Sequence, residues 1–315
     1  MRLLVTGANG FVGKPLCAKF FRNGHTVRAL IRSVNTEVDY FVETIIGSID
    51  ADAVWTSALN DVDVVIHLAA RVHVMQDTAA DPLAEFRKVN VAGTLNLALQ
   101  AAAAGVKRFV FVSSVKVNGE YTLPGQAFTE SDFPAPQDAY GMSKHEAELG
   151  LRQIAVETGM EVVIVRPPLV YGPGVKANFA ALIRAVQHGW PLPLDAVHNQ
   201  RSLVALDNLV DFIVTCAYHP QAANQTFLVS DGHDLSTAEL VRGLAYATGA
   251  PVRLFPVPVR VLQAAAALIG KGDVVQRLCG NLQVNISKAR NILGWAPPIS
   301  VEDGLRRAIT GIKKP

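Results

Sequence analysis

The chain contains few of the residues that build disulfide frameworks, metal sites or nucleic-acid interfaces. Its 315 residues include only three cysteines, Cys17, Cys216 and Cys279, and their odd count and wide spacing fit neither a disulfide network nor a zinc site. The formal net charge is +2, so the basic surplus typical of a nucleic-acid-binding protein is missing. We therefore expect a protein of a reducing compartment, with no metal ion and no nucleic-acid partner.

Long apolar segments are also missing. The chain begins directly with a strand pattern, without the charged and apolar regions of a signal peptide. The most apolar later stretch, Val259 to Gly270, is too short to span a bilayer and predicts a packed helix. These absences predict a cytoplasmic protein with no membrane partner.

A glycine-rich turn near the start of the chain is the first motif with chemical content. An apolar run from Arg2 to Val5 precedes the turn, and helical periodicity follows it as far as Asn23. Glycines at such a strand–turn–helix junction let backbone N–H groups approach a pyrophosphate at the helix N-terminus. We interpret the turn as a dinucleotide-binding site. Its predicted cofactor-binding residues are Gly7, Asn9, Gly10, Phe11, Val12 and Gly13.

The next strand, Thr26 to Arg32, lacks an acidic residue at its end. In dinucleotide-binding folds such an acid, about 20 residues after the glycine turn, accepts hydrogen bonds from a ribose 2′-hydroxyl. Arg32 stands there instead, and a guanidinium pairs with a 2′-phosphate that a carboxylate would repel. The sequence therefore favours NADP over NAD. The alternative is that Arg32 is simply a solvent-exposed strand end.

Two later strands end in residues that could line the same ligand. The strand Asp63 to Ala70 runs into a turn of small residues, so Leu68, Ala69 and Ala70 are predicted to pass the cofactor. His67, within that strand, is predicted to be a hydrogen-bonded structural histidine. The strand Arg108 to Val112 opens into two serines, at the edge where parallel sheets bind ligands.

Tyr140 and Lys144 are four residues apart, so a helix would place a phenol and an ammonium group on one face. That arrangement suits a proton donor with a group that tunes its pKa, and it also suits an ordinary solvated helix face. Asp138 is predicted to cap the helix. One of the two serines within reach of Tyr140 would supply a third polar group.

Four motifs occur in this order: TGANGFVG, SSVKVNG, YGMSK and RPPLVYGPG. Together they resemble the extended short-chain dehydrogenase/reductases, and more narrowly the branch of nucleotide-sugar epimerases, dehydratases and reductases. The resemblance runs from Met1 to about Arg307. It implies an α/β fold with a doubly wound (Rossmann) parallel sheet and a smaller, mixed C-terminal substrate-binding lid. We expect the dinucleotide-binding domain at 1–172, with some later segments returning to it, and a mainly substrate-binding domain at 173–315.

The resemblance also implies roles for individual residues. Tyr140 matches the catalytic tyrosine, which exchanges a proton with a sugar oxygen, and Ser114 matches the serine that hydrogen-bonds the same oxygen. Lys144 matches the lysine that holds the nicotinamide ribose and lowers the tyrosine pKa. Pro167 lies in the segment that passes the nicotinamide. The residues implied to bind the substrate's diphosphate are Asn178 and Arg201, with Arg277 as a further candidate.

One departure from the family pattern narrows the reaction. The dehydratases carry an Asp-Glu pair just after the catalytic hydroxyl residue, where this chain has Val115 and Lys116. Dehydration is therefore disfavoured, and Lys116 is either a substrate contact or an exposed loop lysine. The resemblance favours a reductase acting on the C4 ketone of a UDP-linked 6-deoxy-N-acetylhexosamine in bacterial surface-polysaccharide synthesis.

Two alternatives stay open at this point. The first is a UDP-hexose 4-epimerase with tightly bound NAD. The second is a non-catalytic dinucleotide-sensing protein, which would have no need of the Tyr140–Lys144 pair. A homodimer is also open, because these folds often dimerise through a helix pair.

Overall fold

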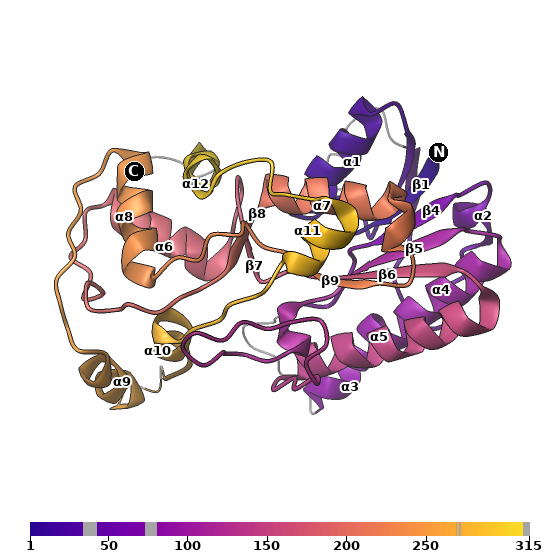
Figure 1. The fold of residues 1–315 in the computed structure, drawn as a ribbon. Helices are drawn as coiled ribbons and strands as arrows, with labels where there is room; N and C mark the ends of the chain where they lie inside the picture. The colour runs from indigo at the N-terminus through magenta and orange to yellow at the C-terminus, as the bar shows by residue number, and fades with distance from the viewer. Residues whose placement is uncertain (34–42, 73–80, 269, 271, 311–315) are drawn as a thin grey trace.

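Seven parallel strands form the central sheet of this computed structural model, which describes residues 1–33, 43–72, 81–268, 270 and 272–310 (Figure 1). The strand order is β3-β2-β1-β4-β5-β6-β9. The strands are β1 (Arg2–Thr6), β2 (Thr26–Ile31), β3 (Glu43–Ile46), β4 (Val64–His67), β5 (Arg108–Val112), β6 (Glu161–Arg166) and β9 (Thr226–Leu228). The order reverses where β1 lies between β2 and β4, which is the switch point at which doubly wound sheets bind ligands. The predicted fold class is confirmed.

Helices cover both faces of the sheet, which explains why its strands are almost continuously apolar. One face carries α1 (Gly13–Arg22), α7 (Leu206–Tyr218) and α11 (Ser287–Leu293) (Figure 1). The other carries α2 (Thr56–Leu59), α3 (Pro82–Arg87), α4 (Thr94–Ala103) and α5 (Ala139–Thr158). Each layer packs its own hydrophobic core against the sheet, so the strand ends are held in fixed register.

The sequence from Pro82 to Ala104 is helical in character throughout, but the structure divides it into three pieces. A π-helical turn at Lys88–Gly93 separates α3 from α4. Within it the buried Asn90 accepts a hydrogen bond from the Arg71 N–H and donates to the Ser143 hydroxyl on α5. The turn therefore ties the segment after β4 to the helix that carries Tyr140.

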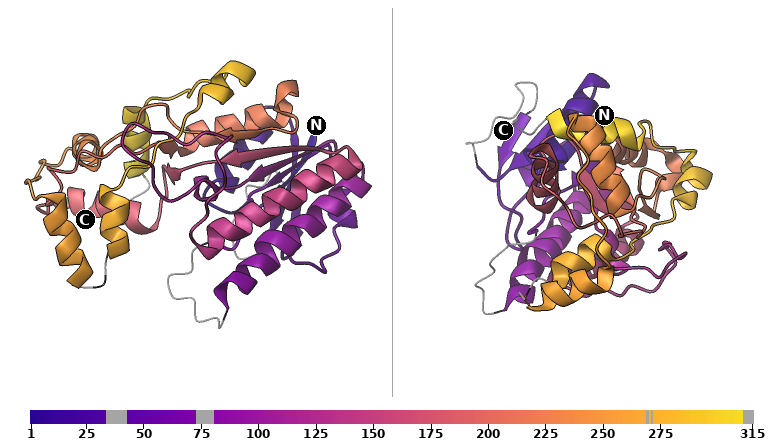
Figure 2. Two further views of the ribbon diagram at one scale, coloured as in Figure 1. Left: turned by 60° about the horizontal axis from the view of Figure 1, so that its bottom comes forward. Right: turned by 90° about the vertical axis from the view of Figure 1, so that its left-hand side faces the viewer.

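The second half of the chain builds a lid beside this sheet (Figure 2). It contains a two-stranded parallel sheet and five helices: β7 (Leu169–Tyr171), β8 (Leu203–Ala205), α6 (Ala177–Gln187), α8 (Thr237–Thr248), α9 (Val259–Leu268), α10 (Gly272–Cys279) and α12 (Val301–Thr310). A third hydrophobic core fills the lid, around Tyr171, Ile183 and Leu244. Three later elements, α7, β9 and α11, return to the main sheet.

Capping residues in the sequence identify the N-terminus of α8 correctly and that of α7 incorrectly. The spacing of Ser236 and Glu239 in the sequence predicts a capping box, and the two residues form it at the start of α8. Asp207 precedes an apolar helical run, and from that position a cap is predicted as well; this prediction is wrong, because α7 begins at Leu206 with Ala205 at its N-cap. Asp207 lies in the first turn instead and accepts a hydrogen bond of 2.8 Å from the guanidinium of Arg307.

Most of the stretch predicted to be a packed helix, Val259 to Gly270, is helical, since α9 covers Val259–Leu268, but α9 is not packed as expected. Ala266 is the buried residue of α9, whereas the Leu268 side chain is 88% exposed. The helix rests on the lid core through Val259 and Leu262 only along one edge. Within the described ranges no helix combines the length and the apolar character that a bilayer crossing needs.

Candidate active site

The glycine turn joins β1 to α1 at the switch point of the sheet. Gly7 has a φ of +65°, and a Cβ there would lie 3.0 Å from the Ala69 backbone nitrogen. At Gly13 a Cβ would lie 2.2 Å from the Gly7 carbonyl oxygen, so only glycine lets α1 start this close to the strand. Backbone atoms of the protein therefore pack directly against Gly7 and Gly13 and leave no room for a side chain at either position.

The residues around this turn fit a dinucleotide. The ten-residue α1 begins at Gly13, so the positive end of its dipole faces the carboxyl edge of the sheet, where a pyrophosphate would bind. The N–H groups of Lys14 and Leu16 are already bonded to the Gly10 and Val12 carbonyls, and Pro15 has no N–H. Asn9, Gly10 and Phe11 border a cavity of about 720 Å³, but its other lining residues come from α1, α7 and the lid, and neither Ala69 nor Lys144 is among them. This cavity therefore lies beside the predicted cofactor site and does not outline it. Arg32 is exposed just beyond the end of β2, where the sequence placed a group for the adenosine ribose.

The end of β4 is fixed by a buried histidine. The two ring nitrogens of His67 lie 2.8 Å from Thr6 Oγ1 and 2.9 Å from Thr94 Oγ1. Burial, and then the charge of Lys144, lower the pKa of His67 to about 3, so the ring is neutral. The same Thr6 hydroxyl accepts hydrogen bonds from the N–H groups of Leu68 and Ala69, which sets the path of residues 68–70 past the turn. His67 is structural, as predicted.

Tyr140 stands in the first turn of α5. Asp138 caps that helix as predicted, because its Oδ1 accepts a 2.7 Å hydrogen bond from the Gly141 N–H. The phenol ring is half-buried and packs edge-on against Phe86 of α3, with 6.2 Å between ring centroids. Burial, and then the nearby Asp138 carboxylate, raise the pKa of Tyr140 to about 12. In the protein alone this side chain is therefore a proton donor.

Lys144 lies one helical turn further on and is buried. Its side chain crosses the end of β5, with Nζ 3.8 Å from the centroid of the Phe111 ring. Burial lowers the pKa of Lys144 to about 7, and the Glu148 carboxylate opposes that effect. Burying an ammonium group costs folding free energy unless a ligand or a neighbouring side chain interacts with its charge, and Lys144 lies on the face of α5 that carries Tyr140. The solvated-face alternative for this pair is excluded.

Ser114 lies at the edge where β5 and β6 end. The next backbone N–H, that of Val115, donates a 3.0 Å hydrogen bond to the Pro167 carbonyl, so the predicted serine and proline segments run side by side. Ser114 caps a short 3₁₀ turn at Val115–Val117, and its Oγ accepts a 3.2 Å hydrogen bond from the Lys116 N–H. The hydroxyl hydrogen remains available to a ligand oxygen.

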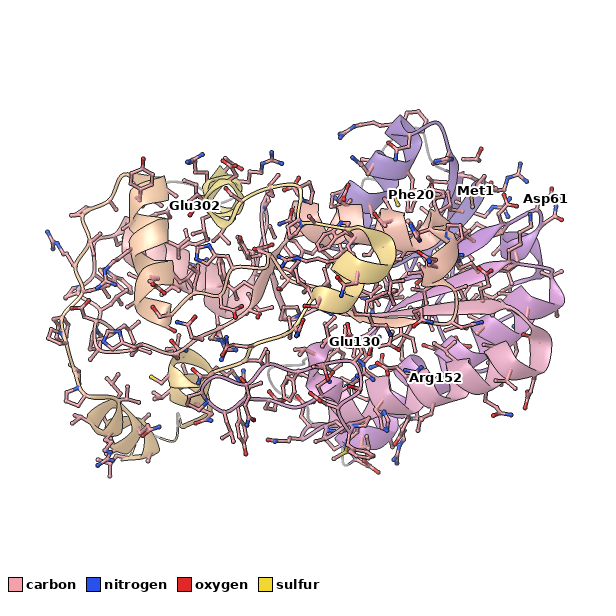
Figure 3. All side chains as sticks on the ribbon, in the orientation of Figure 1. Met1, Phe20, Asp61, Glu130, Arg152 and Glu302 are labelled. Carbon is pink, nitrogen blue, oxygen red and sulfur yellow. The ribbon has the colours of Figure 1, made fainter. Side chains whose placement is uncertain are left out.

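A buried ionic network beneath these groups was missed from the sequence. Arg166, at the end of β6, binds both oxygens of Glu148 at 2.9 and 2.5 Å, and Ser113 donates a 2.6 Å hydrogen bond to the same carboxylate. Arg152, labelled on α5 in Figure 3, approaches Glu148 Oε2 at 3.8 Å. Glu148 follows Lys144 by four residues, so the helical spacing that identified Tyr140 also indicated this position.

Lys116 does not stand free in the site. Its Nζ lies 2.5 Å from Asp138 Oδ2 and 2.7 Å from Glu120 Oε1, and 29% of its side chain is exposed. Neither sequence interpretation anticipated these partners. The ammonium group ties the loop after Ser114 to the N-cap of α5.

The predicted phosphate-binding residues Asn178, Arg201 and Arg277 all belong to the lid. Arg201 donates a 3.0 Å hydrogen bond to the Gly280 carbonyl, and burial lowers its pKa, with the Glu120 charge opposing that shift and the Arg277 charge adding to it. A cavity of about 490 Å³ is lined by Gln200, Gln276 and Gly280, but neither arginine is among its lining residues. Asn178 is exposed in the first turn of α6.

No cluster of three or more histidine, cysteine or acidic side chains in the described part of the chain could hold a metal ion. None of the three cysteines forms a disulfide; Cys17 and Cys216 are buried and Cys279 is half-buried.

Comparison with known proteins gives consistent matches along the chain. Residues 3–230 match the sequence family described as the NAD dependent epimerase/dehydratase family. A protein of Vibrio cholerae described as UDP-glucose 4-epimerase is 50% identical over 308 residues, covering 97% of this chain and 93% of its own length. A UDP-glucose 4-epimerase of Mycolicibacterium smegmatis is 30% identical, covering 98% of this chain and 97% of its own.

The fold also matches solved structures. The UDP-glucose 4-epimerase of Thermotoga maritima, solved with UDP-glucose, superimposes with a TM-score of 0.80 at 23% identity, covering 99% of this chain and 98% of the other. At that identity the likeness establishes a shared fold. The extended arrangement of sheet and lid is therefore common to both chains.

Proposed function

The chain belongs to the NAD dependent epimerase/dehydratase family and is an enzyme of the extended short-chain dehydrogenase/reductase type, and from this premise we propose that it moves hydride at C4 of a UDP-linked sugar. The observation that carries the proposal is the placement of Tyr140 and Lys144 on one face of α5, at the carboxyl edge of the sheet. A protein that only sensed a dinucleotide would have no need of a phenol and a buried ammonium there.

In the proposed reaction the protein handles the proton and the geometry. Tyr140 gives a proton to the C4 ketone oxygen or takes one from the C4 hydroxyl, and Ser114 hydrogen-bonds the same oxygen. Lys144 holds the ribose hydroxyls of the nicotinamide nucleotide and, by its charge, lowers the working pKa of Tyr140. The bound nicotinamide supplies the hydride chemistry, and the glycine turn with Leu68, Ala69, Ala70 and Pro167 positions it.

The substrate class follows from the two arginines of the lid and from the relatives. Arg201 and Arg277 bring two positive charges into one region of the lid, where each acts on the other, and such a pair suits the oxygens of a diphosphate. The Vibrio and Mycolicibacterium relatives are named for a UDP-sugar, which supports UDP as the carrier. Asn178 remains a proposed contact of that diphosphate.

Two reactions are candidates, a net reduction at C4 and an epimerisation at C4. The exposed Arg32 at the end of β2, in place of an acid, favours NADPH, and a net reductase exchanges its cofactor in every turnover. We keep reduction of the C4 ketone of a UDP-linked 6-deoxy-N-acetylhexosamine as the first form. The 50% identity to a UDP-glucose 4-epimerase favours the second form, a UDP-hexose 4-epimerase with tightly bound NAD.

The loss of water from the sugar stays disfavoured. The position that carries an acid in dehydratases is Lys116, and its ammonium group is engaged by Asp138 and Glu120. We further propose the domain division at 172/173, a cytoplasmic location and a homodimer as the frame in which this enzyme works.

One assay separates the two forms. The purified protein is incubated with NADPH and a 4-keto UDP-6-deoxy-N-acetylhexosamine, and separately with UDP-glucose or UDP-galactose without added cofactor. A reductase consumes NADPH only in the first mixture, whereas an epimerase interconverts the two hexoses in the second. Activity in neither mixture, with no rise in melting temperature from UDP or UDP-sugars, would overturn the UDP-sugar assignment.

Replacement of Arg32 by Asp tests the cofactor preference. We expect Arg32→Asp to weaken NADPH binding by roughly 10- to 100-fold and to leave NADH binding nearly unchanged, because the new carboxylate repels a 2′-phosphate but accepts hydrogen bonds from a 2′-hydroxyl. Titration of each cofactor by fluorescence gives both affinities. Equal losses for NADPH and NADH would contradict the 2′-phosphate interpretation.

A further inference from the structure

Lys116 makes the side-chain link between the Ser114 segment and the first turn of α5. Its Nζ lies 2.5 Å from Asp138 Oδ2 and 2.7 Å from Glu120 Oε1. Hydrogen bonds between charged partners are about twice as strong as neutral ones. The lysine therefore fixes two acidic residues from different segments around one ammonium group.

The backbone of the same residue also touches that helix. A Cβ at Gly141 would lie 3.0 Å from the Lys116 carbonyl oxygen and 3.2 Å from Asp138 Oδ1, so a side chain at Gly141 would push the two segments apart. On its other side the Lys116 N–H donates to Ser114 Oγ. Through backbone and side chain together, Lys116 connects the serine that would hydrogen-bond substrate with the turn that carries Tyr140.

Asp138 both caps α5 and forms a salt bridge with Lys116. One oxygen accepts the hydrogen bond from the Gly141 N–H and the other binds Lys116. Asp138 is two residues from Tyr140, and after burial its carboxylate is the main cause of the raised pKa of that phenol. Without Lys116 this negative charge would act on the phenol uncompensated.

We infer that Lys116 is a positioning residue, whose ammonium group holds the Ser114 segment against the first turn of α5 and offsets the charge of Asp138 beside the Tyr140 phenol. The inference rests on the proposed role of Tyr140 in proton exchange. It assigns a task to the residue that replaces an acid of the dehydratases: electrostatic support of the tyrosine in place of acid–base work on the substrate.

Other charged groups near Tyr140 set the background for this effect. Lys144 lies one turn further along α5, and Arg71 stacks over the Phe86 ring that packs on the phenol, with 5.5 Å to the ring centroid. Glu120 also faces Arg201 in the lid. These residues stay in place when positions 116 and 138 are substituted. A shift caused by Lys116→Met therefore reports on Lys116 and its two carboxylate partners, Asp138 and Glu120, and Asp138→Asn isolates the Asp138 part.

Two substitutions with opposite charge effects test the inference. Lys116→Met leaves Asp138 uncompensated, and we expect the Tyr140 ionisation in the pH profile of kcat/KM to move up by about one pH unit. Asp138→Asn removes the negative charge and keeps a good N-cap residue, so the same ionisation should move down by about one pH unit. Lys116→Arg should keep the wild-type profile, and the double variant Lys116→Met/Asp138→Asn should lie near wild type, because the two charge effects on Tyr140 are opposite in sign and add.

A merely structural lysine would give a different result. Both single variants would then lose activity and melting temperature together, without opposite shifts of the profile, and that outcome would overturn the inference. If Tyr140→Phe retains the wild-type rate, the proposed function fails instead. Tyrosinate absorbance of the cofactor-free proteins across the alkaline range, each corrected by its own Tyr140→Phe counterpart, gives an independent readout. Asp138→Asn should ionise at lower pH than wild type and Lys116→Met at higher pH, whereas coincident curves would refute the inference.

Discussion

Replacement of Tyr140 by Phe should lower turnover by roughly 10²- to 10⁴-fold while leaving NAD(P) binding nearly unchanged. The phenylalanine ring keeps the edge-on packing against Phe86 and removes only the hydroxyl that exchanges the proton. Steady-state rates with the substrate identified by the two-mixture assay measure the effect on turnover. Cofactor titration of the same variant measures binding.

Ser114→Ala provides the comparison for that experiment. It removes a hydrogen bond to the substrate oxygen but leaves the proton donor in place, so we expect a smaller loss than for Tyr140→Phe. A Tyr140→Phe enzyme with an unchanged rate would contradict the role assigned to the phenol. A variant that no longer bound cofactor would show instead that the phenol is needed to hold the nucleotide.

The largest expected effect on stability lies beneath the site, in the Glu148–Arg166 pair. Only 3% of the Arg166 side chain and 1% of the Glu148 side chain are exposed. Arg166→Met would leave the carboxylate buried with one arginine removed, and we expect a loss of about 3–5 kcal/mol in the free energy of unfolding. Urea unfolding followed by far-ultraviolet circular dichroism measures it, because the slope with denaturant reports whether the folded state is otherwise intact.

Arg152→Met is the matched control, since Arg152 approaches the same Glu148 oxygen from α5. Its side chain is 46% exposed and the N···O distance is 3.8 Å, so solvent screens the pair and the loss should stay below about 1 kcal/mol. Similar losses for the two methionine variants would show that burial of the Glu148–Arg166 pair is not the source of the effect.

The dinucleotide turn and the Tyr140 helix could be predicted because their signals are local. The glycine positions follow from the space between β1 and the start of α1, and the Asp138 cap lies two residues before Tyr140. A helix also places residues four apart on one face without help from the rest of the fold. The π-helical turn around Asn90 was not predicted, because its hydrogen bonds run to α5 and to the segment after β4.

Two interpretations changed because the decisive partner is distant in sequence. The sequence leaves Lys116 open between a substrate contact and an exposed loop lysine, but its ammonium group binds Asp138, 22 residues later. Asp207 looked like a cap, but its partner is Arg307, 100 residues later. Neither salt bridge could be predicted from the residues around Lys116 or Asp207, because the fold alone brings the two distant segments of each pair together.

The sequence by itself determined the parallel α/β architecture, the dinucleotide turn and the spacing of Tyr140 and Lys144, because helix and strand periodicities are properties of short segments. The tertiary structure decided what surrounds that pair. It buried Lys144 against Phe111, placed Glu148 and Arg166 beneath it, and joined Lys116 to the helix cap. Burial and charge pairing alter a pKa only once the chain has closed around the group, so the chemical state of the site could be read only from the folded protein.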